Sequence, residues 1–111
     1  MTEKMNLIDL TKDITEQYKN FVVSDVNDHC VRIAVFQGNY KWHYHSSSDE
    51  FFMVLEGELQ IDFQDRKTVI LKPNDTIVIP AGTIHRTRAN QRTVNICFEE
   101  KTADTIEVEN G

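Results

Sequence analysis

The chain has 111 residues, which suffices for one domain but not for two. Apolar residues make up 40% and charged residues 27%, a balance typical of a globular protein and not of a disordered one. With 12 basic and 18 acidic residues the net charge is −6, which disfavours binding to nucleic acid or to an anionic membrane. No apolar run approaches the ~18 residues of a membrane helix, and the N-terminus lacks the apolar core of a signal peptide, so we expect a cytoplasmic protein.

Residues 1–19 form the one segment whose pattern predicts a helix. Leu7, Leu10 and Ile14 follow a helical spacing, and either Asp9 or Thr11 is a candidate cap. We therefore expect a short N-terminal helical segment and no helix after it.

Beyond Asn20 the pattern changes to short runs of β-branched and aromatic residues separated by turn residues. The expected strands are residues 21–23, 31–36, 41–45, 50–55, 58–63, 68–71, 76–79, 85–89 and 93–98. Because no connection is long enough for a crossover helix, these strands predict an all-β antiparallel sandwich or barrel over residues 20–100. Residues 101–111 form an acidic C-terminal tail, and we expect the chain from Glu99 onward to be partly loose.

The two cysteines, Cys30 and Cys97, allow one disulfide. Two reduced and buried thiols are the better interpretation in the absence of a secretory signal, because disulfides are rare in reducing compartments.

Most of the glycines and histidines gather in two blocks, with Pro80 inside the second block and Pro73 directly before it. The first block reads G-x4-H-x-H-x4-E-x6-G and runs from Gly38 through His43, His45 and Glu50 to Gly57. The second reads N-D-x4-P-x-G-x2-H and runs from Asn74 through Pro80 and Gly82 to His85.

The spacing of these blocks predicts a metal site. Residues two apart on a strand face the same side, so His43 and His45 direct two imidazoles into one space. Residues 46–49 can turn the chain back and bring Glu50 beside them, while His85 begins a strand after a rigid turn. Three imidazoles and one carboxylate suit a divalent first-row transition metal better than Ca²⁺ or Mg²⁺. We therefore predict His43, His45, Glu50 and His85 as the ligands of such a metal, with Fe, Mn, Zn and Ni as candidates.

The two blocks resemble the two motifs of the cupin superfamily. Residues 49–59 (DEFFMVLEGEL) are also similar to small single-domain cupins of the kind labelled mannose-6-phosphate-isomerase-like. The resemblance covers about residues 20–100 and implies a double-stranded β-helix, or jelly-roll barrel. It also implies that the histidines and the glutamate of the first block, with the histidine of the second, bind the metal inside the barrel.

Three positions depart from the pattern of that family. The first block has four residues between Gly38 and His43 where the family usually has five. Asn74 stands where the family has glycine, but asparagine tolerates the left-handed conformation of a turn. Ala89 replaces an asparagine that is not a metal ligand, so the predicted ligand set is unaffected.

The resemblance implies metal-dependent enzymes, such as dioxygenases and isomerases, as well as sensors and non-catalytic binders. We favour a metal-dependent enzyme acting on a small organic substrate, because four ligands leave open positions on a metal that prefers five or six. The alternative is a non-catalytic small-molecule-binding or sensor protein, with or without metal.

Strand alternation predicts the neighbours of the site. Phe52 and Val54 share the orientation of Glu50 and would form the apolar walls of a substrate pocket. Lys41 shares the orientation of His43 and could reach an anionic substrate, although a solvated lysine at the rim is the simpler interpretation.

Other charged and aromatic residues have interpretations without a role in the site. Arg86 and Arg88 alternate with His85 and are expected on the solvated outer face, and His29 is expected in a turn.

The segment 51–55 is apolar on both of its faces. Phe51, Met53 and Leu55 point away from the predicted barrel interior and need a cover. Either packing within the chain, by the N-terminal segment or by a second sheet, or a second subunit supplies it, and we predict a homodimer.

Overall fold

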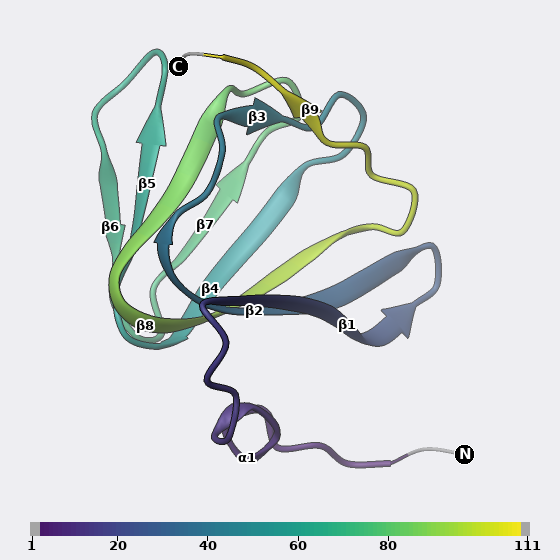
Figure 1. Ribbon diagram of the computed structural model, residues 1–111. Coiled ribbons are helices and arrows are strands. Elements are labelled where there is room, and N and C mark those ends of the chain that lie inside the picture. Colours follow the sequence, from purple (N-terminus) through teal and green to yellow (C-terminus); the bar gives the residue numbers. More distant parts are fainter. Residues whose placement is uncertain (1–2, 110–111) are drawn as a thin grey trace.

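Short strands joined by tight turns form a curled antiparallel barrel in the computed structural model, which describes residues 3–109 (Figure 1). The expected all-β fold is therefore confirmed. Within the described residues the strands are β1 (Tyr18–Val26), β2 (His29–Asn39), β3 (His43–Tyr44), β4 (Glu50–Glu56), β5 (Leu59–Phe63), β6 (Val69–Leu71), β7 (Thr76–Ile79), β8 (His85–Glu100) and β9 (Ile106–Glu107). The part of the chain that the structure describes contains no helix long and apolar enough to cross a membrane.

The N-terminal helix α1 spans Leu7–Thr11 and is capped differently from the sequence prediction. The cap is Asn6, whose side-chain oxygen accepts a hydrogen bond of 3.0 Å from the backbone N–H of Asp9. Asn6 has the extended conformation that an N-cap requires, whereas Asp9 and Thr11 lie inside the helix. Because α1 ends at Thr11, the expected helical stripe that continued to Ile14 is wrong.

Strand β8 joins the two sides of the barrel. Its first residues pair with β5 and its later residues pair with β4, while β2 follows most of its length. The expected turn at residues 90–91 is absent, because β8 curves through this region without ending. The partner strand accommodates the curve with a register shift between Phe36 and Gly38, where Gly38 has a φ of 109°.

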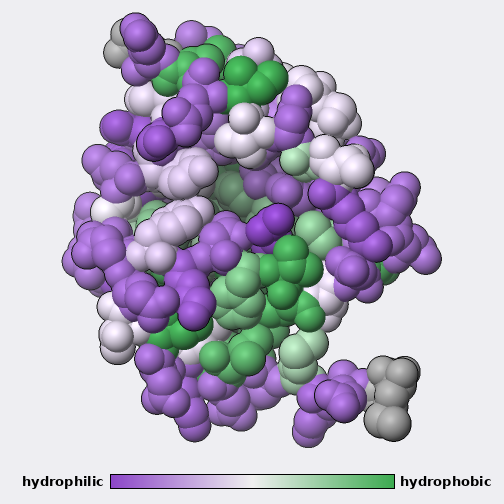
Figure 2. Space-filling model, turned by 45° about the vertical axis from the view of Figure 1, so that its right-hand side comes forward, coloured by the Kyte–Doolittle hydropathy of each residue, from purple (hydrophilic) through white to green (hydrophobic). Residues whose placement is uncertain are grey.

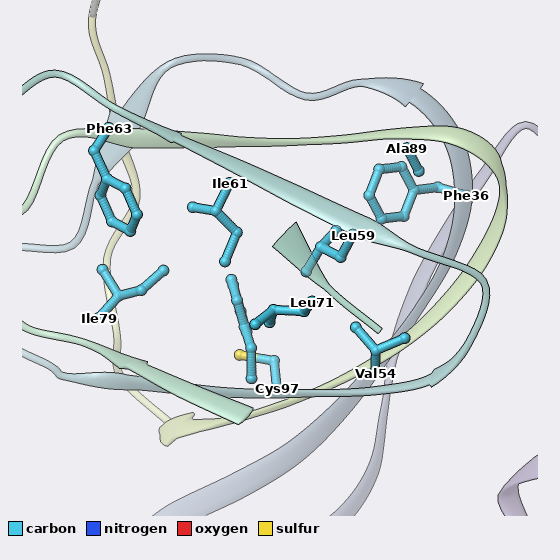
Figure 3. Close-up of a cluster of buried hydrophobic side chains, with 10 residues drawn as sticks. Phe36, Val54, Leu59, Ile61, Phe63, Leu71, Ile79, Ala89 and Cys97 are labelled. Carbon is cyan, nitrogen blue, oxygen red and sulfur yellow. The ribbon is translucent and has the colours of Figure 1, made fainter. Parts of the chain in front are cut away.

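Two groups of apolar side chains lie on opposite faces of the curved sheet. The larger group fills the barrel between its two sides (Figure 3). Its fully or nearly fully buried members are Phe36, Phe52, Val54, Leu59, Ile61, Phe63, Leu71, Ile79, Ala89 and Cys97. The smaller group lies on the outer face, where Leu7, Ile14 and Leu55 pack on Ile33, Val35 and Val94. The N-terminal segment therefore covers Leu55, as one of the two interpretations of this face predicted.

The acidic tail is more ordered than its sequence suggested. Strand β9 pairs with β3, and the backbone N–H of Val108 donates to the carbonyl of Trp42 at 3.0 Å. Of the tail that we expected to be partly loose, residues 106–107 are paired with the edge of β3, whereas residues 101–105 form no strand. This pairing also brings the tail against the predicted metal site.

Cys30 and Cys97 are both buried and unpaired, so the expectation of two free thiols is confirmed. The left-handed conformation expected at Asn74 is also present, with a φ of 74°.

Candidate metal centre

The barrel brings the three predicted histidines together from two parts of the chain. His43 in β3 is paired with His85, the first residue of β8, and His45 follows β3 directly. The ring centroids of His43 lie 4.4 Å from His85 and 5.0 Å from His45. All three side chains are buried, and their ligand atoms lie within 4.8 Å of one another.

Glu50 completes the cluster from the start of β4. Its Oε1 atom is 3.1 Å from His45 Nε2 and 3.5 Å from His85 Nε2. The loop before Glu50 is anchored to the turn before His85, since the N–H of Gly82 donates to the His45 carbonyl at 2.7 Å. Asp49 strengthens this link, because its carboxylate accepts from the N–H of Ala81 at 2.8 Å.

Each histidine is held through the nitrogen that faces away from the cluster. The Nδ1 atoms of His43, His45 and His85 lie 2.7, 2.7 and 2.8 Å from the backbone carbonyls of Lys41, Asp104 and Thr83. Because a carbonyl only accepts, each Nδ1 carries the proton, and the neutral ring then presents an unprotonated Nε2 to the cluster. This is the tautomer that a metal ion requires.

The atoms that face one another in the cluster lack hydrogen bonds of acceptable geometry. Within the described residues, four buried side-chain polar atoms have no hydrogen-bond partner, and three of them are His45 Nε2, Glu50 Oε1 and His85 Nε2. The short distances to Glu50 therefore bring these atoms close without satisfying them. Buried polar groups without partners are rare and costly, so their convergence fits a bound divalent cation.

Burial and the neighbouring charges shift the ionisation of the cluster strongly. Burial lowers the pKa of His43 to about 4. Burial also acts to lower the pKa of His45, but the adjacent Glu50 carboxylate raises it to about 9. Burial opposes ionisation of Glu50, yet the adjacent imidazoles of His45 and His85 hold its pKa well below the usual range. Without metal, the cluster is therefore a carboxylate paired with one protonated imidazole.

Cys97 lies next to the cluster without the properties of a ligand. Its Sγ atom donates to Glu50 Oε2 at 3.0 Å. Burial and then the Glu50 charge raise the pKa of this thiol, so it remains protonated and does not supply a thiolate.

Glu99 is an acidic neighbour that the sequence prediction missed. Together with His45 and Glu50 it forms a second group of buried ligand atoms within 4.8 Å of one another. Burial, followed by the nearby Glu50, raises the pKa of Glu99. Glu99 shares the strand orientation of Cys97, so continuing the strand alternation beyond residue 98 would have placed it here.

A cavity of about 350 Å³ opens onto the cluster. Its lining residues are Tyr18, Asn20, Arg32, Ala34, Phe36, Tyr40, His43, His45, Glu50, Phe52, Thr87, Asn95, Cys97, Glu99, Ala103 and Thr105. Tyr18 and Tyr40 stack with ring centroids 5.5 Å apart and form an aromatic wall. The cavity thus combines polar groups at the cluster with aromatic and apolar surface, as small-molecule sites do.

The structure separates the three predicted pocket residues. Phe52 lines the cavity, whereas Val54 is completely buried in the barrel core. Lys41 does not line the cavity, and its Nζ pairs with Glu107 at 3.1 Å on the exposed surface. This arrangement matches the interpretation of Lys41 as a solvated rim residue.

The arginines near His85 occupy an environment that differs in part from the one expected. The guanidinium groups of Arg86 and Arg88 both bind the buried carboxylate of Asp62, with nitrogen–oxygen distances of 2.9 and 2.7 Å. The expected solvated position is met only in part, because the two side chains are 31% and 29% exposed and β5, which pairs with this end of β8, presents Asp62 to them. His29 lies at the start of β2, 2.7 Å from the carboxylate of Asp28, and takes no part in the cluster.

A cupin-domain family model matches residues 31–97 of this chain. Since the match covers more than half of the chain and the barrel and histidine cluster agree with it, the chain belongs to the cupin superfamily. It is 54% identical over 109 residues to the uncharacterized protein YdbB of Bacillus subtilis (strain 168), across 98% of this chain and 96% of that protein.

Two solved structures illustrate the range of proteins with this fold. A cupin-2 domain containing protein from Shewanella frigidimarina has 29% identity and a TM-score of 0.81, over 87% of this chain and 94% of its own. The DMSP lyase DddQ from Ruegeria pomeroyi has 19% identity and a TM-score of 0.69, over 84% of this chain and 51% of its own. The second similarity concerns the fold alone.

Proposed function

We propose that this protein is a metal-dependent enzyme acting on a small organic substrate, with the metal bound by His43, His45, Glu50 and His85. The observation that carries the proposal is the convergence of three unpartnered buried atoms, of which those of His45 and Glu50 belong to residues that line a cavity. A divalent metal held there would act as a Lewis acid toward substrate oxygens or, if it is iron, activate O₂. Fe, Mn, Zn and Ni all accept these ligands, since availability decides the metal as much as the ligand set does.

The protein's own residues define where a substrate binds. Phe52 and the stacked pair Tyr18–Tyr40 offer apolar and aromatic contacts beside the cluster. The His45–Glu50 pair holds one proton in the absence of metal, and a metal ion must displace that proton. The backbone carbonyls behind the histidines keep the rings oriented while ligands exchange.

The alternative function is a non-catalytic sensor or small-molecule-binding protein with the same centre. The protonated state of Cys97 favours it, because the thiol beside the cluster is not activated as a nucleophile. The two functions share the metal and the cavity and differ only in turnover.

Metal analysis followed by turnover measurement tests the proposal. The purified protein is loaded separately with Fe, Mn, Ni and Zn, dialysed, and analysed for metal and for oxygen uptake with candidate diols and thiols. The proposal expects one metal per chain and substrate consumption with at least one of the metals. Metal binding without consumption of any candidate would favour the sensor or binder, and absence of metal would contradict both.

We also expect the protein to form a homodimer. Phe51 and Met53 remain half-buried on the outer face of β4, and Val78 of the neighbouring strand is 56% exposed. Figure 2 shows two groups of hydrophobic side chains on one face of the molecule, in the lower middle and near the top, among hydrophilic ones. A dimer mass by light scattering at micromolar concentration is expected, and Met53→Glu should weaken association more than metal binding. A monomeric mass for the unmodified protein would contradict the dimer.

Three further properties stay predictions: the mannose-6-phosphate-isomerase-like subtype, the cytoplasmic location and the absence of nucleic-acid binding. The two unpaired cysteines support a reducing compartment.

A further inference from the structure

We propose that Asn95 is a specificity-determining residue that anchors the ligand of the cavity through its side-chain amide, and that this ligand is a hydroxylated carboxylate. The inference rests on the proposed function, because it assumes that the ligand also coordinates the metal. It assigns a role to a residue outside the predicted ligand set.

Asn95 lies in the middle of β8 with its side chain among apolar neighbours. It is 4% exposed and lines the cavity. Its cross-strand partners are Ala34 on β2 and Val54 on β4, neither of which has a polar side-chain atom. No side chain of these adjacent positions can satisfy its amide.

The side-chain oxygen of Asn95 is the fourth unpartnered buried polar atom of the described residues. An unsatisfied buried polar atom costs about 1–3 kcal/mol, and folded proteins retain few of them. The other three such atoms belong to the metal cluster. His45, Glu50 and Asn95 line the same cavity, so one bound ligand can lie beside the metal centre and the Asn95 oxygen.

Asn95 is close enough to the metal centre for one small molecule to contact both. Cys97 is two residues further along the same face of β8, and its Sγ touches Glu50. Residues two apart on a strand are separated by about 6.6 Å. A ligand with an oxygen on the metal therefore needs a chain of a few atoms to reach the Asn95 amide.

The polar groups of the cavity define the ligand class. A hydroxyl group suits Asn95, because it can donate to the amide oxygen and accept from the amide nitrogen. Arg32 is the single lysine or arginine among the residues that line this cavity in the described chain. Its side chain is 37% exposed, lies 3.7 Å from the Glu99 carboxylate and donates to Asn20, so a ligand carboxylate would have to share it with Glu99. Arg32 and a divalent cation both favour a carboxylate, so a carboxylate with hydroxyl groups along its chain matches all three contacts.

Two matched acids test this assignment. Gluconate and 2-hydroxyhexanoate offer the same 2-hydroxycarboxylate group to a metal, but only gluconate carries further hydroxyl groups. Their binding to the Mn-loaded protein is measured by calorimetry for the unmodified chain, Asn95→Leu and Asn95→Ala. Asn90→Leu is the control, because Asn90 lies on the same strand but is exposed.

The unmodified protein and Asn90→Leu should bind gluconate at least about tenfold more tightly than 2-hydroxyhexanoate. Both Asn95 variants should lose that preference while retaining one metal per chain. In the metal-free state, Asn95→Leu should keep or raise the melting temperature, because it removes a buried amide oxygen that has no partner. Asn95→Ala removes the same amide without adding volume, which guards against a failure caused by the larger leucine.

Equal binding of the two acids by the unmodified protein would overturn the inference, and so would a preserved preference in both Asn95 variants. A large fall in the melting temperature of both variants would assign the amide to the fold instead. Absence of metal from the unmodified protein would overturn the proposed function itself, which elemental analysis shows before any acid is added.

Discussion

Two buried carboxylates on opposite strands of the barrel, Asp62 and Glu50, look alike by burial and charge but differ in how their oxygens are satisfied. Both have a pKa held well below the usual range, Asp62 mainly by Arg88 and Glu50 by His45 and His85 against its burial. Each oxygen of Asp62 accepts hydrogen bonds, from the side chains of Thr68, Arg86 and Arg88. Glu50 has an unpartnered oxygen beside two unpartnered imidazole nitrogens.

The difference shows that a shifted pKa does not by itself identify a binding site. Asp62 is part of a closed hydrogen-bond network that joins β5 to β8 and needs no further partner. The Glu50 cluster is open, since its atoms face one another without satisfying one another. The presence of buried polar atoms without hydrogen-bond partners distinguishes the candidate functional site from the structural one.

The largest effect is expected from Glu50→Gln. Loss of the carboxylate should weaken metal binding by about 100-fold or more, because a ligand contributes at least as much as its supporting partners do. The metal-free protein should also lose the stability that the raised pKa of His45 contributes, since the protonated ring no longer has the carboxylate beside it. Calorimetric metal titration and urea unfolding measure the two quantities separately. A variant with normal metal affinity would show that the open cluster is not the site.

Replacing the histidines tests the same site without changing a carboxylate. His45→Ala should lose most of its metal, whereas His29→Ala should retain one metal per chain, because His29 lies outside the cluster. Elemental analysis after dialysis measures both. Equal loss of metal in the two variants would remove the distinction on which the ligand assignment depends.

Asp62→Asn should lower the stability of the protein and leave its metal affinity almost unchanged. It breaks charge-assisted hydrogen bonds to Arg86 and Arg88 and should lower the free energy of unfolding by about 1–3 kcal/mol. Metal affinity should stay within a factor of two or so of the unmodified protein, because Asp62 does not belong to the cluster. Urea unfolding and metal titration of one preparation check both statements. A parallel loss of metal would mean that the two regions are coupled.

The two regions should also respond to pH in opposite directions. The pKa of Asp62 is lowered in the folded state, so its contribution to stability is present above its ordinary value of 3.8 and is lost as the pH falls. The pKa of His45 is raised to about 9, so in the metal-free protein its contribution is complete below 6.5 and is lost as the pH rises through 9.

The affinity for metal should depend on pH in the direction opposite to the stability contribution of His45. A metal ion needs the neutral ring, so its binding at pH 7 should release about one proton and should strengthen as the pH rises toward 9. Calorimetry in two buffers with different ionisation enthalpies measures the released proton. A binding enthalpy independent of the buffer would contradict the protonated state of His45.

The barrel and the principal members of the cluster could be predicted because they depend on local periodicity. Strand alternation relates His43 to His45, and short turns carry the chain to Glu50 and to His85. The bend in β8 could not be predicted in this way, because polar residues such as Asn90 and Gln91 fit an exposed strand as well as a turn. The ion pairs of Arg86 and Arg88 could not be predicted either, because their partner Asp62 comes from another strand.

Long-range pairing accounts for the site residues that the sequence did not reveal. Asp104 supports His45 only because β9 pairs with the edge of β3. Glu99 lines the cavity because β8 continues beyond residue 98, whereas Asn95 lies within the predicted strand 93–98. No motif marks these residues, and their orientation follows from the register of strands far apart in the sequence.

The smallest effect is expected from Asp104→Ala, which tests whether the tail helps to orient His45 for metal binding. The Asp104 carboxylate accepts hydrogen bonds from the backbone N–H of Ser46, at 2.8 Å, and from the Ser46 hydroxyl, and its carbonyl orients the His45 ring. Alanine keeps that carbonyl but removes the carboxylate and its hydrogen bonds to Ser46. Metal affinity should therefore fall about tenfold or less, which is within the loss expected when a residue that supports a metal ligand is replaced. Asp65→Ala is the matched control, because Asp65 is exposed and pairs only with Arg66. Equal metal affinities for the two variants would show that β3 and β9 pairing alone holds His45, whereas a loss as large as that of Glu50→Gln would place Asp104 in the site itself.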